Sequence, residues 1–279
     1  MLDLVNSQFN RTRGTEMSKR LTGIVFVSFL SLIAVIVSST CVANIKNPST
    51  HTEARAVIKA AMDQWRGTTS QTQIKMTIHR PDWQRVMTMT AWTEGDKNSL
   101  VRVATPKKDA GSATLLKDNQ MWTFSPKVNR VIRIPSSMMN QPWMGGDFSN
   151  KDISKSTDVL DSYTHTLDRI DQDNGHQVYV ITSVPNSDAA VVWGKEVFKI
   201  RNDHVLLEQQ FWDQDGRLIK SLTALKIAAL GGRTLATQLR MIKHDKPEEW
   251  TEMTTLSAEF DITLSSQVFT LSNLRNPRR

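Results

Sequence analysis

The sequence predicts a mainly β protein with few helices, folded as a barrel or a strongly curved open sheet. Beyond residue 74, apolar and polar residues alternate with a period of two, as in strands that bury one face. The connections between these segments are short and rich in Asp, Asn and Gly, which favours antiparallel pairing of consecutive strands. Helix-length segments do not alternate with the strands, so the pattern disfavours a parallel βαβ sheet.

An amphipathic helix is expected before the strands. Thr50 and Glu53 have the spacing of a capping box, in which each side chain satisfies a backbone N–H at the start of the helix. Gly67 follows the last apolar residue and tolerates the left-handed conformation that ends many helices. One apolar stripe at helical spacing contains Ala54, Val57, Ile58, Ala61, Met62 and Trp65. We expect this stripe to cover the core.

The first half of the chain then alternates as a series of short strands. Residues 125–130 begin with Ser125-Pro126 and are polar, as expected for a hairpin loop. Pro135 ends the last strand of this series, because proline has no N–H to donate to a ladder. The expected strands are residues 74–79, 86–92, 100–104, 113–116, 121–124 and 131–134.

The second half is predicted to be a meander. Ser149 and Asp152 can cap a short helix that continues through Val159 and Leu160. Asp173-Asn174-Gly175 is a strong hairpin signal between the first two strands that follow. The expected strands are residues 164–170, 178–183, 197–201, 205–212, 218–225, 235–242 and 250–256. We expect the apolar tail at residues 268–274 to pack back on the sheet.

The loop after Pro135 is unusually apolar for a connection. Five large apolar residues surround Gly145-Gly146 with neither a helical nor a strand period: Met138, Met139, Trp143, Met144 and Phe148. Methionine is flexible and suits surfaces that adapt to irregular apolar ligands. The loop is therefore interpreted as a hydrophobic plug of the protein's own core, a gate over a ligand, or a docking patch for another protein.

The same region resembles a known family. Trp122, Ser125-Pro126, Arg130, residues 133–135, residues 144–148 and Asp152 together are similar to the central motif of LolA-like outer-membrane lipoprotein-sorting proteins. The resemblance implies an open antiparallel half-barrel, of the LolA/LolB type, with an α-helical lid over an apolar cavity that holds acyl chains. One departure is Gly146, where the family pattern has a small hydroxyl residue such as serine. We expect this difference to matter little, since both residues are small.

The resemblance also implies a site and a set of partners. The residues expected to line the cavity are Trp122, Phe124, Ile132, Ile134, Met138, Met139, Trp143, Met144 and Phe148. Those expected at its rim are Arg130, Arg133, Gly145 and Asp147, and the two arginines have a carboxylate partner on the solvated face as their alternative role. The implied partners are lipoprotein acyl chains or another lipid, an inner-membrane exporter of the ABC or RND type, and an outer-membrane acceptor.

The N-terminal region predicts export to the periplasm. Lys19-Arg20, the uncharged apolar residues 21–37 and the small residues that follow describe a signal peptide, with Met17 as the start and cleavage before Asn44. The alternatives are an uncleaved membrane anchor formed by residues 21–37 and lipidation at Cys41. The expected organisation is an extension and signal peptide at residues 1–43, and a single lipid-binding domain at residues 44–279.

Composition and motifs narrow the function to binding. The net charge of +7 is too dispersed for a nucleic-acid-binding stripe but suits anionic lipid headgroups. The chain has no nucleophile elbow, phosphate loop or paired metal-ligand histidines, so we expect no enzyme activity, catalytic residue, metal or cofactor. A monomeric periplasmic carrier is the favoured function. A sensor or assembly module of the same fold, and a membrane-anchored lipoprotein, are the alternatives.

Overall fold

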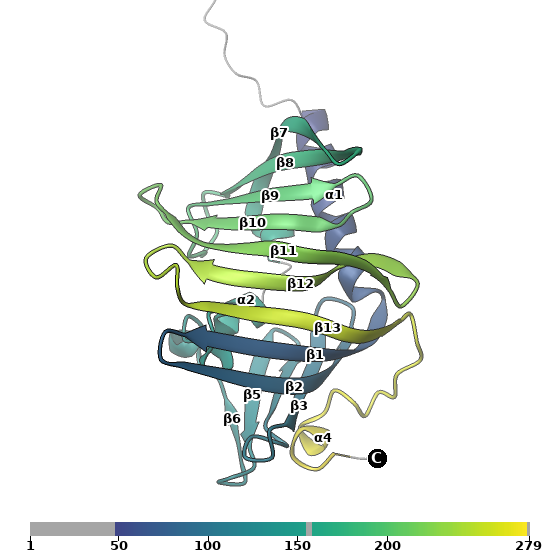
Figure 1. Ribbon diagram of the computed structural model, residues 1–279, viewed down its shortest axis with the longest axis vertical. Coiled ribbons are helices and arrows are strands. Elements are labelled where there is room, and N and C mark those ends of the chain that lie inside the picture. The colour runs from purple at the N-terminus through teal and green to yellow at the C-terminus, as the bar shows by residue number, and fades with distance from the viewer. Residues whose placement is uncertain (1–47, 155–157, 278–279) are drawn as a thin grey trace, which may run out of the picture. The chain divides into compact units, whose positions relative to one another are not determined.

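A computed structural model describes residues 48–154 and 158–277, which form one open antiparallel sheet with few helices (Figure 1). The sheet has 13 strands in the order β6-β5-β4-β3-β2-β1-β13-β12-β11-β10-β9-β8-β7. The predicted signal peptide, the anchor alternative and Cys41 lie outside the described residues. No helix among the described residues has the length and hydropathy that a membrane span requires.

The helices are short except for the first. They are α1 (Pro48–Arg66), the 3-10 turns η1 (Ser136–Met138) and η2 (Trp143–Gly145), α2 (Asn150–Ser154), α3 (Val159–Ser162) and α4 (Leu271–Arg275). The strands are β1 (Thr69–Arg80), β2 (Trp83–Glu94), β3 (Asn98–Thr105), β4 (Ala113–Lys117), β5 (Gln120–Ser125), β6 (Arg130–Arg133), β7 (Tyr163–Asp173), β8 (His176–Pro185), β9 (Lys195–Arg201), β10 (Leu206–Trp212), β11 (Leu218–Leu230), β12 (Arg233–Lys243) and β13 (Trp250–Phe260).

The strand order dictates where the apolar loop must run. β6 and β7 are consecutive in the chain, yet they form the two opposite edges of the sheet. The connection between them therefore has to cross the sheet from one edge to the other. Figure 1 shows α1 and α2 behind the sheet, on the same side. We call the side that carries these helices the inner face, and the opposite side the outer face.

α1 covers the inner face beside strands β7–β9. Its apolar stripe places Ala54, Ile58 and Ala61 in a buried cluster. The same cluster contains Ile181 of β8 and Phe198 of β9, which lie opposite each other across the two strands. The stripe thus covers the core as the sequence predicts, except that Trp65 is 47% exposed and does not belong to the cluster. The helix begins at Pro48, two residues before the N-cap that we expected at Thr50, and proline suits a first turn because it lacks the N–H that would be unpaired there.

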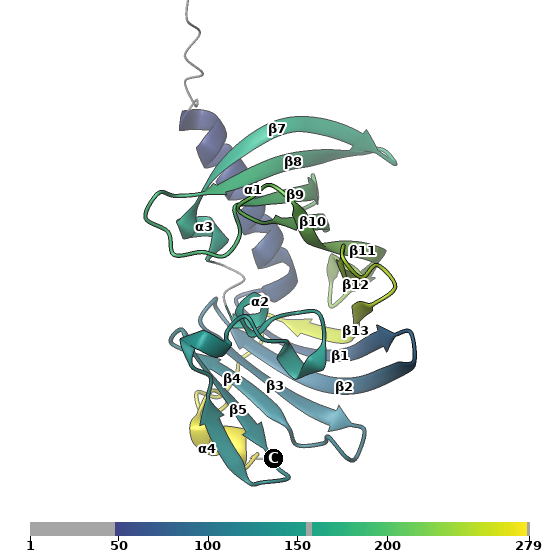
Figure 2. The ribbon, with the colours of Figure 1, turned by 90° about the vertical axis from the view of Figure 1, so that its left-hand side faces the viewer.

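The C-terminal tail covers the outer face beside strands β2–β6 (Figure 2). Phe269 and Leu274, the latter in α4, are buried against Leu100, Leu115 and Phe124. This arrangement confirms that the apolar tail packs back on the sheet. It also corrects the expected cavity lining, because Trp122 belongs to this outer cluster together with Phe124. In a strand, residues two apart share a face, so both side chains point away from the inner face.

The predicted helix after the apolar loop is two short helices, α2 and α3. The capping pair is present at the first of them. The backbone N–H of Ser149 donates to Asp152 Oδ2 at 2.7 Å, and the N–H of Asp152 donates to Ser149 Oγ at 3.1 Å. The sequence therefore predicted the start of this helix but not its length.

Candidate functional site

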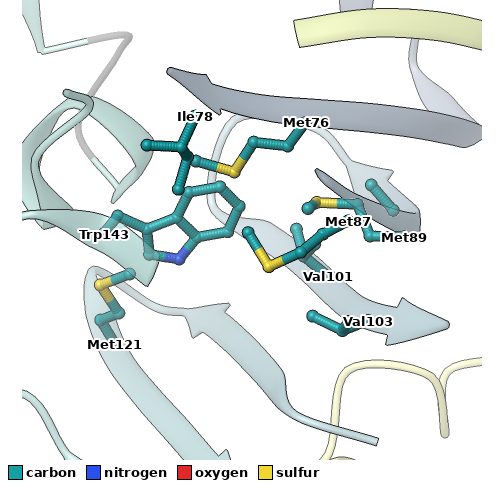
Figure 3. Packing of buried hydrophobic residues seen from close by; sticks show 9 residues of the cluster. Met76, Ile78, Met87, Met89, Val101, Val103, Met121 and Trp143 are labelled. Atoms are coloured by element: carbon teal, nitrogen blue, oxygen red, sulfur yellow. The ribbon is translucent and has the colours of Figure 1, made fainter. Parts of the chain in front are cut away.

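The inner face of strands β1–β5 carries a surface rich in methionine (Figure 3). Met76 lies opposite Met87 of β2 on one side and Met253 of β13 on the other, so their side chains emerge together on one face. The buried members of this cluster are Met76, Ile78, Met87, Met89, Ala91, Val101, Val103, Met121 and Trp143. Flexible thioethers in such number give a surface that can adapt to varied apolar shapes.

Residues 135–154, which we call the cover segment, lie over this surface. Figure 3 shows the indole of Trp143 inserted between Met76, Ile78 and Met87. The Trp143 side chain is 4% exposed, and its Nε1 donates a hydrogen bond to Thr114 Oγ1 at 3.1 Å. Indole supplies a large apolar area and one N–H that needs a partner when buried. Trp143 therefore fills the space above the methionines and fixes the cover segment there.

The cover segment holds its own backbone together. The N–H of Trp143 donates to the carbonyl of Phe148 at 2.7 Å, and that of Lys151 to the carbonyl of Met139 at 2.8 Å. Pro142 and Ser149 form an isolated β-bridge within the same segment. These internal hydrogen bonds make the segment a compact unit. Its attachment to the sheet depends mainly on side chains.

The turn at residues 144–146 brings the cover segment close to the sheet. Met144 has φ +51° and Gly145 has φ +81°, so the chain makes a tight left-handed turn there. A Cβ atom built on Gly146 would lie 2.6 Å from Met76 Cε and 3.2 Å from Thr251 Oγ1. Serine fits at this position if the flexible end of the Met76 side chain moves away, so the expectation that the difference matters little depends on that movement.

Asp147 makes the first polar attachment of the cover segment. Its side chain is fully buried and accepts hydrogen bonds from Arg80 at 3.0 and 3.1 Å and from Thr251 Oγ1 at 2.6 Å. Lys243 Nζ lies 3.6 Å from the same carboxylate. Removing one partner of a buried, hydrogen-bonded ion pair is costly, because the other charge remains desolvated. Asp147 therefore serves as an anchor of the segment, on the same face as Trp143.

Asp152 makes the second attachment. Its Oδ2 lies 2.5 Å from Lys220 Nζ, and the Lys220 side chain is 5% exposed. The ammonium also lies 4.8 Å from the centre of the Phe211 ring and 5.1 Å from that of Trp193, distances suitable for cation–π attraction. Phe148 of the cover segment is buried beside Phe211 and thus packs next to this ion pair.

A polar row borders the inner face near the second attachment. The register places six residues opposite one another across β7–β12: His165, Ser183, Glu196, Phe211, Lys220 and Lys243. Burial raises the pKa of Glu196 to about 7. Burial likewise lowers the pKa of His165 to about 4, and its Nδ1 contacts Ser183 Oγ at 2.8 Å. Water is scarce along this row, because His165, Ser183, Glu196 and Lys220 are all buried.

A separate hollow of about 960 Å³ lies beside α1. Its lining includes Lys59, Arg66 and Arg233, whose charges are partly matched by Asp63 and Asp261. The lining contains none of the cover-segment residues. This polar hollow is a poor match for an acyl chain, so the methionine surface beneath Trp143 is the stronger candidate site.

The structure brings together only some of the residues that were predicted to line the cavity. Met139, Met144 and Ile134 pack against the methionine cluster around Trp143, and Phe148 packs beside Phe211. Met138 is half-buried, and Gly145 is an exposed turn residue. Ile132 is 49% exposed on the edge strand β6 and does not line an enclosed surface. The outer-face positions of Trp122 and Phe124 are described above.

The predicted rim arginines are not the residues that hold the cover segment. Arg130 and Arg133 are exposed, and the structure describes no ion pair for either of them. Arg133 lies opposite Trp122 and so points to the outer face, which corrects its assignment to the cavity rim. Arg80 and Lys220 hold the segment instead, and sequence reasoning missed both. Lys220 had one signal, since it occupies an inward position of an alternating strand between Leu218 and Leu222.

The described residues contain no candidate metal site. Across residues 48–154 and 158–277, no group of three or more His, Cys, Asp or Glu side chains is placed to hold a metal ion. The arrangement beneath the cover segment is one of apolar surface, aromatic rings and ion pairs. Such a surface binds ligands by burial and charge.

Comparisons with known proteins agree on the fold. A family model described as "-like: Uncharacterized protein" matches residues 95–276, about two thirds of the chain. A comparison with curated proteins gives no match. A solved structure of a DUF1329 family protein from Desulfovibrio piger ATCC 29098 is 21% identical, with a TM-score of 0.72 over 81% of this chain and 99% of that one.

Two further solved structures carry more descriptive names. An outer membrane lipoprotein-sorting protein domain from Vibrio parahaemolyticus is 21% identical, with a TM-score of 0.70 over 81% of this chain and 99% of that one. A LolA superfamily protein from Nitrosomonas europaea is 20% identical, with a TM-score of 0.64 over 78% of this chain and 97% of that one. These similarities confirm the predicted fold class, a mainly β open antiparallel sheet with few helices.

Proposed function

The chain belongs to the family whose model matches residues 95–276 and has the fold of the lipoprotein-sorting domain and the LolA superfamily protein described above, and from that premise we propose that it is a periplasmic carrier of acylated cargo. The acyl chains of a lipoprotein or a related lipid bind against the methionine surface on the inner face, beneath the cover segment. One observation carries this proposal. The cover segment packs on an inner face of flexible thioethers, and its backbone–backbone hydrogen bonds lie within the segment itself. Its hydrogen bonds to the sheet involve sheet side chains, as where the N–H of Asp147 donates to Thr251 Oγ1 and Arg85 donates to the carbonyl of Met144.

The chemistry of that surface suits an acyl chain. Each CH₂ group removed from water contributes about 0.8 kcal/mol, so a long chain gains much from an enclosed apolar surface. Methionine side chains have several rotatable bonds and fill irregular gaps at little cost. An acyl chain that replaces the Trp143 indole would meet Met76, Met87, Met121 and Met253, which differ little from a hydrocarbon in polarity.

The closed position of the cover segment has a physical reason. Without cargo, Trp143 protects the methionines from water and the two carboxylates neutralise cations of the sheet. Opening therefore exposes apolar area and breaks the pairs Asp147–Arg80 and Asp152–Lys220. Cargo compensates for the exposed apolar area, and a loaded protein can thus hold the segment away from the sheet without any chemical fuel.

Transfer requires a donor and an acceptor on either side of the periplasm. We assign loading to an inner-membrane exporter and unloading to an outer-membrane acceptor, with the protein acting as a monomer between them. The carrier function predicts adequate affinity and quick dissociation rather than a tight polar lock. Adaptable methionine contacts provide that balance.

Binding is tested with the exported protein and long-chain acyl lipids. A hydrophobic reporter dye should bind, an acyl lipid should displace it, and the same lipid should raise the thermal midpoint by mass action. Met253→Gln, on the methionine surface beneath the cover segment, should weaken binding of the lipid, while Met62→Gln, a half-buried methionine on α1, serves as the matched control. The proposal fails if saturating lipid changes neither the dye signal nor the midpoint.

A further inference from the structure

Three cations of the sheet face carboxylates of the cover segment on the inner face. Arg80 and Lys243 face Asp147, and Lys220 faces Asp152. Both carboxylates belong to the cover segment, whereas all three cations belong to strands. When the segment moves away to admit cargo, the negative charges leave with it and the positive charges remain.

The two lysines are placed so that they require an anion. Lys220 and Lys243 lie directly opposite each other across β11 and β12. Like charges in that position repel, and here the carboxylates of the cover segment offset the repulsion. Lys220 is also nearly buried, between Phe211 and Trp193, so water does not solvate its ammonium well.

The acidic groups that stay on the sheet do not replace both carboxylates. Glu249 lies 3.1 Å from Arg80 and 3.5 Å from Lys246, so it is engaged by those two cations. Glu196 is in the row of Lys220, and it accepts a hydrogen bond from Gln209 at 2.7 Å. It is one carboxyl group in a row that contains two lysines. Lys220 and Lys243 are therefore left without a full countercharge in the open form.

We propose that the cargo carries an anionic group next to its acyl chains, and that this group takes the place of Asp152 and Asp147 on Lys220, Lys243 and Arg80. A phosphate ester in a lipid headgroup fits best, since several donors can share its oxygens. The inference rests on the proposed function, because it assumes that acyl chains occupy the methionine surface. It adds headgroup charge as a determinant of which lipid is carried.

The position of the cations suits a headgroup rather than a chain. Lys220 is near the start of β11, Lys243 is at the end of β12, and Arg80 is at the end of β1, so all three lie at the same border of the inner face. The next inward row contains Met241 and Leu222, which lie opposite each other. A lipid would thus place its charge at the border and its chains over the apolar rows.

The test compares lipids that differ in headgroup charge. Dioctanoyl phosphatidylglycerol and dioctanoyl phosphatidylcholine, below their micelle concentrations, are titrated calorimetrically into the exported protein and three variants. Lys220→Met removes the charge but keeps the length, Lys220→Arg keeps the charge, and Lys195→Met is the matched control. Lys195 stacks on Trp212 at 3.9 Å and is adjacent to Glu196 in β9, so it points to the outer face.

The wild type should bind the anionic lipid about tenfold more tightly than the zwitterionic one. Lys220→Met should abolish that preference, whereas Lys220→Arg and Lys195→Met should retain it. A circular dichroism melt identifies any variant that does not fold. If Lys220→Met does not fold, the salt dependence of the lipid preference is measured for Lys220→Arg instead. Glycerol phosphate, which lacks acyl chains, should not compete.

Other outcomes overturn the inference in distinguishable ways. Equal affinity for both lipids would refute the headgroup preference and leave the carrier proposal intact. A preference that survives in Lys220→Met would place the anion elsewhere. Competition by glycerol phosphate at the affinity of the lipid would indicate a site for free phosphate. If neither lipid binds, both the inference and the proposed function fail.

Discussion

Replacing Trp143 by alanine separates a displaceable cover from an ordinary piece of core. Truncating a buried Trp typically costs about 3–5 kcal/mol of stability. Trp143 is 4% exposed, and the change also leaves the hydroxyl of Thr114 without its indole donor. We therefore expect the free energy of unfolding of the unliganded protein to fall by a few kcal/mol, at the lower end of about 3–5 kcal/mol if the cover segment can relax.

The affinity for acyl lipid should move in the opposite direction. In the wild type, cargo must first displace the indole, so only the fraction of molecules in which the cover segment is open can bind. The apparent affinity is weakened by that fraction. Every 1.4 kcal/mol of docking free energy that Trp143 no longer provides should tighten binding about tenfold. Lipid at about 100 times its dissociation constant should then restore roughly 2.7 kcal/mol of stability.

The assay pairs urea unfolding with lipid titration on the same variant. Trp92→Ala is the matched control, because Trp92 is half-buried on the outer face and its Nε1 donates to Gln71 Oε1 at 2.8 Å. That variant should lose stability without gaining lipid affinity. A Trp143→Ala variant that loses stability, gains no affinity and is not restored by lipid would make the cover segment a permanent part of the core and refute the reasoning.

Three further predictions follow from the ion pairs, the buried carboxyl group and the N-terminal region. Asp147→Asn should lower the free energy of unfolding by about 3–5 kcal/mol, measured by urea titration, because Arg80 keeps its buried charge; a loss under about 1 kcal/mol would show the pair to be solvated. The raised pKa of Glu196 favours its neutral form in the folded state, so its contribution to stability falls as the pH rises from 4.5 to about 7. Glu196→Gln cannot ionise and should lack that slope, so the stability difference between wild type and variant should change over this pH range, and a difference that does not change with pH would contradict the assignment. N-terminal sequencing of the exported protein should begin at Asn44, whereas a diacylated Cys41 as first residue, or an intact apolar segment at residues 21–37, would exclude a freely diffusing carrier.

Local pattern was enough to predict the strands. Each of the 13 strands overlaps a segment where apolar residues alternate or where turn signals bound a short apolar run. The structure extends several of them, most clearly β11, which continues to Leu230 rather than ending at residue 225. Alternation depends on burial of one face, so it is visible in the sequence whatever the neighbouring strands are.

The site was only partly predictable, because alternation does not tell which segment of the chain packs on each face of the sheet. Trp122 and Phe124 share a face, as the sequence implies, but contact with Phe269 puts them under the C-terminal tail. That contact joins residues far apart in the chain. The attachments of Arg80 and Lys220 to the cover segment have the same long-range origin, and only the lysine at an inward strand position gave a local signal.

The strand order explains why the apolar loop lies at the candidate site. Its methionines and aromatics marked it as unusual in the sequence, but the sequence left a plug, a gate and a docking patch as alternatives. Placing β6 and β7 at opposite edges forces the loop across the inner face, and this puts Trp143 on the methionine surface. The structure thus shows a plugged state, in which ion pairs hold the cover segment on the sheet. In the proposed carrier, cargo displaces the segment against these ion pairs, while the hydrogen bonds within the segment stay intact.

The most direct test of the carrier account is photo-crosslinking with a fatty acid that bears a diazirine at the end of its chain. Mass spectrometry of the digested protein should locate the label on Met76, Met87, Met253 or their inner-face neighbours, and excess unlabelled lipid should prevent the labelling. Labelling confined to the outer face or to the hollow beside α1, or labelling that unlabelled lipid does not reduce, would contradict binding of acyl chains beneath the cover segment.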